Sequence, residues 1–119
     1  MDTIFDKYPV QMKLKISDGA TLVLFSSYES EDKYFPEIME KELFLFDNNE
    51  NVIWSLDINE DEFWFYNEID KVKQRRFQKT WFCYIYKKNN HYYIQNINGF
   101  IFEIDISTGK GKFSHWEKI

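Results

Sequence analysis

Two histidines, a glutamate and a lysine near the carboxyl terminus are the residues whose types could do acid–base chemistry. They are His91, Glu103, Lys112 and His115, on neighbouring predicted strands. In an alternating strand, Glu103 and Asp105 would share a face and could meet His91 across the sheet. Two histidines with a lysine could cleave a phosphodiester. No motif fixes their roles, and the acidic first half of the chain would repel a polyanionic substrate, so we predict no catalytic residue and no enzyme.

The sequence contains few residues that could bind a metal or a cofactor. The soft ligands are His91, His115 and the sole cysteine, Cys83, and their spacing matches no metal motif. The segment Gly109-Lys110-Gly111-Lys112 resembles a phosphate-binding loop in composition. Such a loop needs a strand before it and a helix after it, so we interpret this one as a turn with two exposed lysines. We predict no metal and no cofactor.

The charge of the chain is segregated along the sequence. Residues 29–70 hold fourteen of the twenty carboxylates against two lysines, a formal charge of −12, whereas residues 71–119 hold three carboxylates against ten basic residues, a charge of +7. A negative field of this size repels nucleic acid and anionic membranes and speeds encounters with basic surfaces. We therefore expect a basic protein as partner, with no direct contact to nucleic acid or membrane.

Alternation of apolar and polar residues predicts strands. Residues 10–16 alternate before the turn Asp18-Gly19, and an apolar run follows at 21–25. Residues 43–46 and 52–56 flank a second turn, and residues 80–86 and 92–94 flank a third. The chain then passes through Asn98-Gly99 into 100–106 and through Thr108-Gly109 into 112–116. The second half therefore predicts an antiparallel meander.

Helical signals are few. One short helix is predicted from Asn67 to Phe77, with acids in its first turn and bases in its last, and at most a turn or two after Pro36. The predicted fold is mainly β, an antiparallel meander forming a sandwich, half-barrel or curved sheet with one or two short helices. Residues 1–119 are predicted to form a single domain, and 20% aromatic residues supply its core.

The cellular location is predicted to be the cytoplasm. A single cysteine leaves no internal disulfide, and the first residues, Met1 to Asp6, are acidic where a signal peptide is basic. No apolar run approaches the roughly 20 residues that a membrane-spanning helix needs.

Two acidic segments interleaved with aromatic residues are the predicted partner-binding site. In residues 60–66, three acids precede four aromatics; if this segment is extended, Phe63 and Phe65 face one way and Trp64 and Tyr66 the other. One pair then belongs to the core, and Trp and Tyr are common interface anchors. The alternative is a buried double face with solvated acids. The predicted binding residues are Glu29, Glu31, Asp32, Glu37, Glu60, Asp61, Glu62, Trp64 and Tyr66.

In its small size, acidic charge and aromatic content, and in its lack of catalytic motifs, the chain resembles the immunity proteins encoded beside polymorphic bacterial toxins, including those of contact-dependent growth inhibition. This resemblance implies a protein that binds a cognate toxin domain, often a basic nuclease, and covers its active site. Two alternatives stay open: a small-ligand-binding β-barrel whose aromatics line a cavity, and an acidic regulatory subunit of another basic protein.

Overall fold

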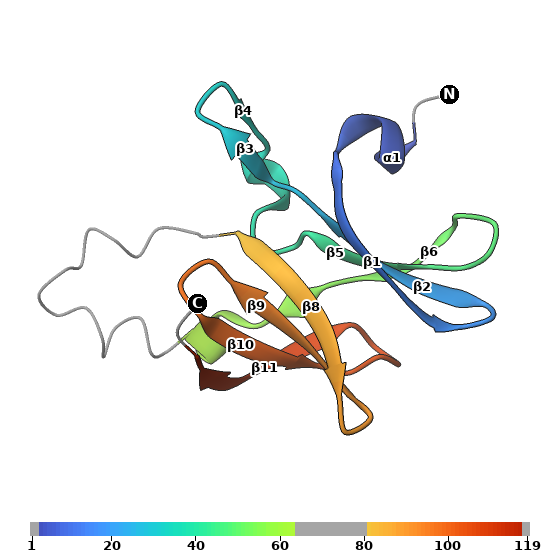
Figure 1. Ribbon diagram of the computed structural model, residues 1–119, viewed down its shortest axis with the longest axis vertical. Helices are drawn as coiled ribbons and strands as arrows, with labels where there is room; N and C mark the ends of the chain where they lie inside the picture. The colour runs from blue at the N-terminus through green and yellow to red at the C-terminus, as the bar shows by residue number, and fades with distance from the viewer. Residues whose placement is uncertain (1–2, 64–80, 118–119) are drawn as a thin grey trace, which may run out of the picture.

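A computed structural model describes residues 3–63 and 81–117 of the chain (Figure 1). Within these residues the secondary structure is mostly β, as the alternating sequence predicts. The elements in chain order are α1 (Ile4–Lys7), β1 (Val10–Ser17), β2 (Ala20–Phe25), β3 (Tyr28–Ser30), β4 (Lys33–Tyr34), the 3-10 turn η1 (Pro36–Ile38), β5 (Leu43–Phe46), β6 (Val52–Ser55), β7 (Asp57–Ile58), the 3-10 turn η2 (Glu60–Phe63), β8 (Phe82–Lys88), β9 (His91–Asn96), β10 (Phe100–Ile104) and β11 (Lys110–Trp116).

The described strands form two larger sheets and one small hairpin. Sheet A has the order β1-β2-β5-β6 and is antiparallel throughout. Sheet C has the order β7-β11-β10-β9-β8; its four long strands are an antiparallel meander, and β7 joins β11 in parallel. The hairpin β3–β4 stands apart from both. The sheets are open rather than closed into a barrel, and side chains from both of them fill the space between.

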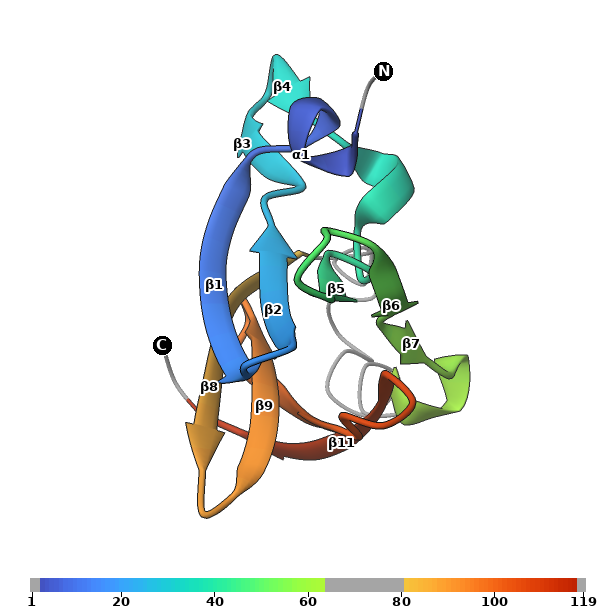
Figure 2. The same cartoon turned by 90° about the vertical axis from the view of Figure 1, so that its right-hand side faces the viewer.

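Strand β2 is apolar without alternation because both of its faces are buried. Leu22 and Leu24 point between the two sheets, and Val23 and Phe25 point to the other side of sheet A. There Phe5 of α1 packs on Phe25, with ring centroids 5.5 Å apart. Figure 2 shows α1 and η1 at the same end of sheet A. The sheet therefore carries a second, smaller core on its outer side.

The main core fills the space between the sheets. Sheet A and the residue that follows it contribute Leu22, Leu24, Leu43, Leu45, Trp54 and Leu56, and sheet C contributes Phe82, Ile85, Ile94, Phe100, Phe102 and Ile104. Phe102 is fully buried and meets Phe82 edge to face at 5.8 Å. Because side chains occupy this space, the two layers are held together by burial of apolar area.

Two seams join the sheets at their edges. On one side the chain crosses from β6 into β7, and Trp54 Nε1 donates to the carbonyl of Ile106 at 2.6 Å. On the other side β1 lies against β8, where Gln11 Nε2 donates to the carbonyl of Cys83 at 3.0 Å. The crossing at Trp54 therefore ties the β10–β11 turn to sheet A.

The prediction of a mainly β, antiparallel fold with short helices is confirmed. The turn after Pro36 is present as η1, and the predicted hairpins are present as β1–β2, β5–β6, β8–β9 and the meander. The helix predicted from Asn67 to Phe77 lies outside the described residues. The sequence did not predict α1, the hairpin β3–β4, β7 or η2. Each is four residues or shorter, and none is marked by a proline or a turn motif of the kind that indicated η1 and the hairpin β5–β6.

Candidate functional site

The chain between β2 and β5 leaves sheet A and forms a projecting acidic lobe, which we define as residues 28–41. It contains the hairpin β3–β4 and η1, and it stands at one end of the molecule (Figure 1). Its five carboxylates outnumber its two lysines, so its formal charge is −3. Four of the predicted binding residues fall here with exposed side chains: Glu29, Glu31, Asp32 and Glu37.

Most of the lobe carboxylates are exposed and form no ion pair with a described lysine, arginine or histidine. Lys33 Nζ lies 2.9 Å from Glu29 Oε2, an exposed pair of the kind that contributes at most about 1 kcal/mol. Within the described residues, Glu31, Asp32 and Glu37 form no ion pair. These three carboxylates therefore present negative charge to the solvent, where a basic surface can contact them.

Aromatic contacts hold the lobe to the body at its root. The Phe35 ring packs edge to face on Tyr8 at 5.1 Å, and the Phe35 amide donates to the carbonyl of Ser27 at 2.6 Å. Tyr28 stacks on Trp81 with ring centroids 4.4 Å apart. Tyr34 pairs with Tyr28 at the base of the hairpin and is 50% exposed, whereas the turn at its tip is Glu31-Asp32. The root is therefore anchored and carries one exposed ring, while the tip presents carboxylates.

Glu42 lies at the foot of the lobe and differs from the acids above it. Its side chain is fully buried, and its Oε2 accepts hydrogen bonds from Ser27 Oγ at 2.6 Å and from the Phe82 amide at 3.0 Å. Burial raises the pKa of this carboxyl from the ordinary 4.5 to about 7, against the opposing effect of the two hydrogen bonds. The sequence placed Glu42 in the acidic stretch and gave no sign of its burial.

The second acidic segment lies elsewhere. Asp61 on η2 is exposed, whereas Glu62 is half-buried and its Oε1 accepts from the Phe113 amide at 3.1 Å. That bond ties η2 to β11 at a distance from the lobe, which occupies the other end of the long axis (Figures 1 and 2). The described acids Asp61 and Glu62 therefore lie away from the lobe. The side chain of Glu60, and Trp64 and Tyr66, lie outside the described residues.

The outer face of sheet C carries a group of aromatic residues that sequence reasoning missed. The Tyr86 ring stacks on Tyr84 at 5.7 Å and on Tyr93 at 5.2 Å. These rings border an open hollow of about 470 Å³ that also includes Gln95 and His115. The available signal was Tyr84-Ile85-Tyr86, because alternation around the buried Ile85 sends both tyrosines outward.

The histidines of this face do not converge on one reacting position. His91 Nδ1 lies 3.4 Å from Glu103 Oε2, which confirms the predicted meeting across the sheet. His115 Nε2 lies 3.2 Å from Glu117 Oε1. The Tyr93 ring stands between the two imidazoles, 6.5 Å from His91 and 6.3 Å from His115. Each histidine therefore has its own carboxylate, and no shared acid–base pair forms.

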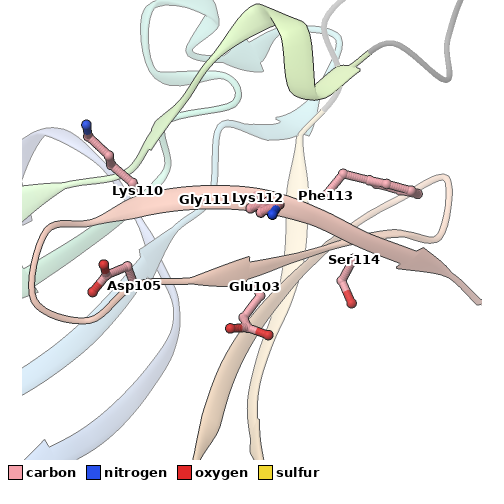
Figure 3. Close-up of a pocket in the computed structure, with 7 residues that line it drawn as sticks. All are labelled: Glu103, Asp105, Lys110, Gly111, Lys112, Phe113 and Ser114. Atoms are coloured by element: carbon pink, nitrogen blue, oxygen red, sulfur yellow. The ribbon is translucent and has the colours of Figure 1, made fainter.

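A second open hollow, of about 480 Å³, lies along the β10–β11 hairpin. Figure 3 shows Glu103, Asp105 and Ser114 projecting to one side of the hairpin, while Lys110 projects to the other. Lys110 and Lys112 are exposed, as interpreted from the glycine-lysine segment. The charged groups here diverge, so the hollow does not assemble a site for a small anion.

The described residues contain neither a metal-ligand set nor a helix that could span a membrane. In that part of the chain, no three His, Cys, Asp or Glu side chains gather as a ligand set. None of the helices there has the length and apolar character to span a bilayer. Comparison with protein families, with curated proteins and with solved structures finds no match to this chain.

Proposed function

We propose that this chain is an immunity protein, which binds a basic toxin domain of the nuclease type and neutralises it by covering its active site. The observation that carries the proposal is the acidic lobe, where Glu31, Asp32 and Glu37 are exposed and, within the described residues, lack a cation. Active sites that hold phosphate are lined by lysine and arginine. Carboxylates on a projecting hairpin can reach and pair with such groups.

The two kinds of lobe residue have different expected roles. Exposed carboxylates attract a basic partner from a distance, so they set the rate of encounter and its dependence on salt. An aromatic ring that becomes desolvated in the complex mainly slows dissociation. Tyr34, half exposed at the base of the β3–β4 hairpin, is the lobe aromatic residue that we expect in that role.

The first prediction concerns the charge of the lobe. Reversing Glu31 and Asp32 to lysine is expected to lower the association rate with the cognate toxin domain by about tenfold at low salt and to flatten its salt dependence. The toxin domain to test is the product of the adjacent upstream gene, first by co-purification and then by stopped-flow or surface binding kinetics. Asp18→Lys with Asp57→Lys is the matched control, since both residues are exposed outside the lobe and the net charge change is the same.

Equal slowing by both pairs would mean that net charge, and not the lobe, steers association. Unchanged kinetics in the lobe variant would remove the lobe from the interface. Absence of any complex with the neighbouring gene product, in a co-purification that recovers the folded chain, would count against the immunity function itself.

The second prediction concerns the exposed ring of Tyr34. Tyr34→Ala is expected to speed dissociation by about tenfold or more while leaving the association rate within about twofold, because the ring contributes buried contact area and carries no charge. Tyr34→Phe is the control, since it keeps the ring and removes the hydroxyl. A dissociation rate that does not change in Tyr34→Ala would place the ring outside the contact.

The alternatives to this function differ in what they require of the fold. A ligand-carrying β-barrel needs an enclosed apolar cavity, whereas the described strands form open sheets with side chains filling the space between them. An acidic subunit of another basic protein would use the same lobe by the same physics. Identification of the co-purified partner separates that alternative from an immunity protein.

A further inference from the structure

One oxygen of Glu42 connects three segments at the root of the acidic lobe. Ser27, which donates to Oε2, is the last residue before the lobe, and Glu42 itself is the first residue after it. Phe82, whose amide donates to the same oxygen, begins β8 in the opposite sheet. The Glu42 carboxyl group therefore connects both ends of the lobe to the first residue of β8 in sheet C.

The other oxygen of Glu42 is buried without a hydrogen-bond partner among the described residues. An ionised carboxylate in such a place costs much more free energy than a neutral carboxyl, because the charge is desolvated and one oxygen has nothing to replace water. The free-energy cost of ionisation falls if water reaches Oε1. Since Ser27 and Glu42 close the root from both ends, water would enter by separating them.

Among the described residues, little charge surrounds Glu42 to oppose this effect. On β8, Cys83 is the titratable neighbour; burial raises the pKa of its thiol, and the charge of Glu42 adds to the rise. Ser27 and Phe82 supply neutral donors. On its own segment Glu42 follows Glu40 and Lys41, and no described Lys, Arg or His forms an ion pair with it.

We propose that Glu42 is a positioning residue that clasps the acidic lobe to the body while its carboxyl is neutral and loosens the lobe when it ionises. The clasp is a property of the free protein. Its consequence for binding rests on the proposed function: a basic partner meets a firmly held lobe at mildly acidic pH and a looser one at alkaline pH. Loosening raises the cost of ordering the lobe on binding, so affinity falls as pH rises.

The test is a pH titration of the free protein by NMR, from pH 5 to 9. The side-chain carboxyl carbon of Glu42, the Phe82 amide and the backbone amides of residues 28–34 are expected to shift together, with one midpoint near the Glu42 pKa of about 7. In Glu42→Gln the pH-dependent change in the amide chemical shifts of residues 28–34 is expected to disappear. His91 and His115 remain in this variant, so loss of the pH-dependent shift assigns it to Glu42.

Ser27→Ala is a second variant, which keeps the carboxyl and removes one of its donors. The Ser27 hydrogen bond favours the ionised form, so its loss is expected to move the shared midpoint to higher pH. Glu37→Gln is the control, because it removes an exposed lobe carboxylate that takes no part in the clasp. Lobe amides that stay constant while Glu42 titrates, or a pH-dependent shift that survives in Glu42→Gln, would overturn the proposal.

The consequence for binding is tested with a ten-residue lysine peptide as probe, acetylated at its amino terminus so that its charge stays nearly constant from pH 6 to 8.5. Its affinity for the wild-type chain is expected to fall about fivefold over this range, against less than about twofold for Glu42→Gln. A lobe that titrates with Glu42 in a chain that does not bind the peptide would support the clasp and count against the proposed function. Binding that weakens equally in both chains would overturn the link between clasp and affinity.

Discussion

Replacing Glu42 by glutamine is expected to raise the free energy of unfolding by about 3 kcal/mol at pH 8 and to leave it nearly unchanged at pH 4. The pKa of Glu42 is about 7 in the folded protein and 4.5 in an ordinary carboxyl. Between these two values the folded chain holds a proton that the unfolded chain has lost, so stability falls as pH rises. The loss begins near pH 4.5 and is complete above pH 7. Glutamine stays neutral throughout and avoids it.

Urea unfolding of both chains at intervals from pH 4 to 8.5 measures this effect. Other carboxyl groups also titrate at low pH, but they are common to both chains, so the difference between the two curves isolates Glu42. That difference is expected to grow with pH over the interval between the two pKa values and then to level off. A difference that stays constant at every pH would mean that the pKa of Glu42 is the same in the folded and the unfolded chain, which would contradict this prediction.

Strand pairing was largely predictable from sequence because it depends on local signals. The alternation of residues 10–16 and the turn Asp18-Gly19 specify β1 and β2, and both are present in register around that turn. The meander β8 to β11 follows in the same way from alternating residues and turns. These signals use nearest neighbours in sequence, and a two-residue period is hard to satisfy with any other structure.

Burial of Glu42 and the outer core of sheet A were not predictable, since both depend on residues distant in sequence. Glu42 is enclosed by Ser27 and Phe82, 15 and 40 residues away. Phe25 is covered by α1, a four-residue helix whose start is supported by hydrogen bonds from the Thr3 amide and hydroxyl to Asp6 Oδ2, at 3.0 and 3.2 Å. Helices this short carry no periodic pattern that a sequence could reveal.

The candidate site was predictable in part, at the level of charge. The sequence located the exposed acids of the lobe correctly as an acidic and aromatic segment, and the structure adds that they project from the body on a hairpin. It could not show that η2 lies away from them, because that separation depends on where the chain crosses from β6 of sheet A to β7 of sheet C. Formal charge along a chain therefore indicates which segments carry like charge, and not how those segments are arranged in space.

Gly109→Ala is expected to lower the free energy of unfolding by about 3 kcal/mol, combining a strained backbone with overpacking. Gly109 has a φ of +82°, and an added Cβ would lie 2.6 Å from Cδ2 and Cε3 of Trp54. Trp54 cannot retreat freely, because its Nε1 donates to the carbonyl of Ile106 at 2.6 Å. The Asp57 amide also donates to the Gly109 carbonyl at 2.9 Å. The substitution therefore strains the seam where sheet A crosses into sheet C.

Gly19→Ala is the matched control for this prediction. Gly19 also lies in a turn, but an added Cβ there meets nothing within 4 Å, so its effect on stability is expected to stay within about 0.5 kcal/mol. Urea unfolding monitored by tryptophan fluorescence compares the two, and Trp54 is expected to become more exposed in the folded state of Gly109→Ala alone. Equal stability of the two variants would show that Trp54 can shift without cost and that the β6–β7 crossing does not depend on the absence of a side chain at position 109.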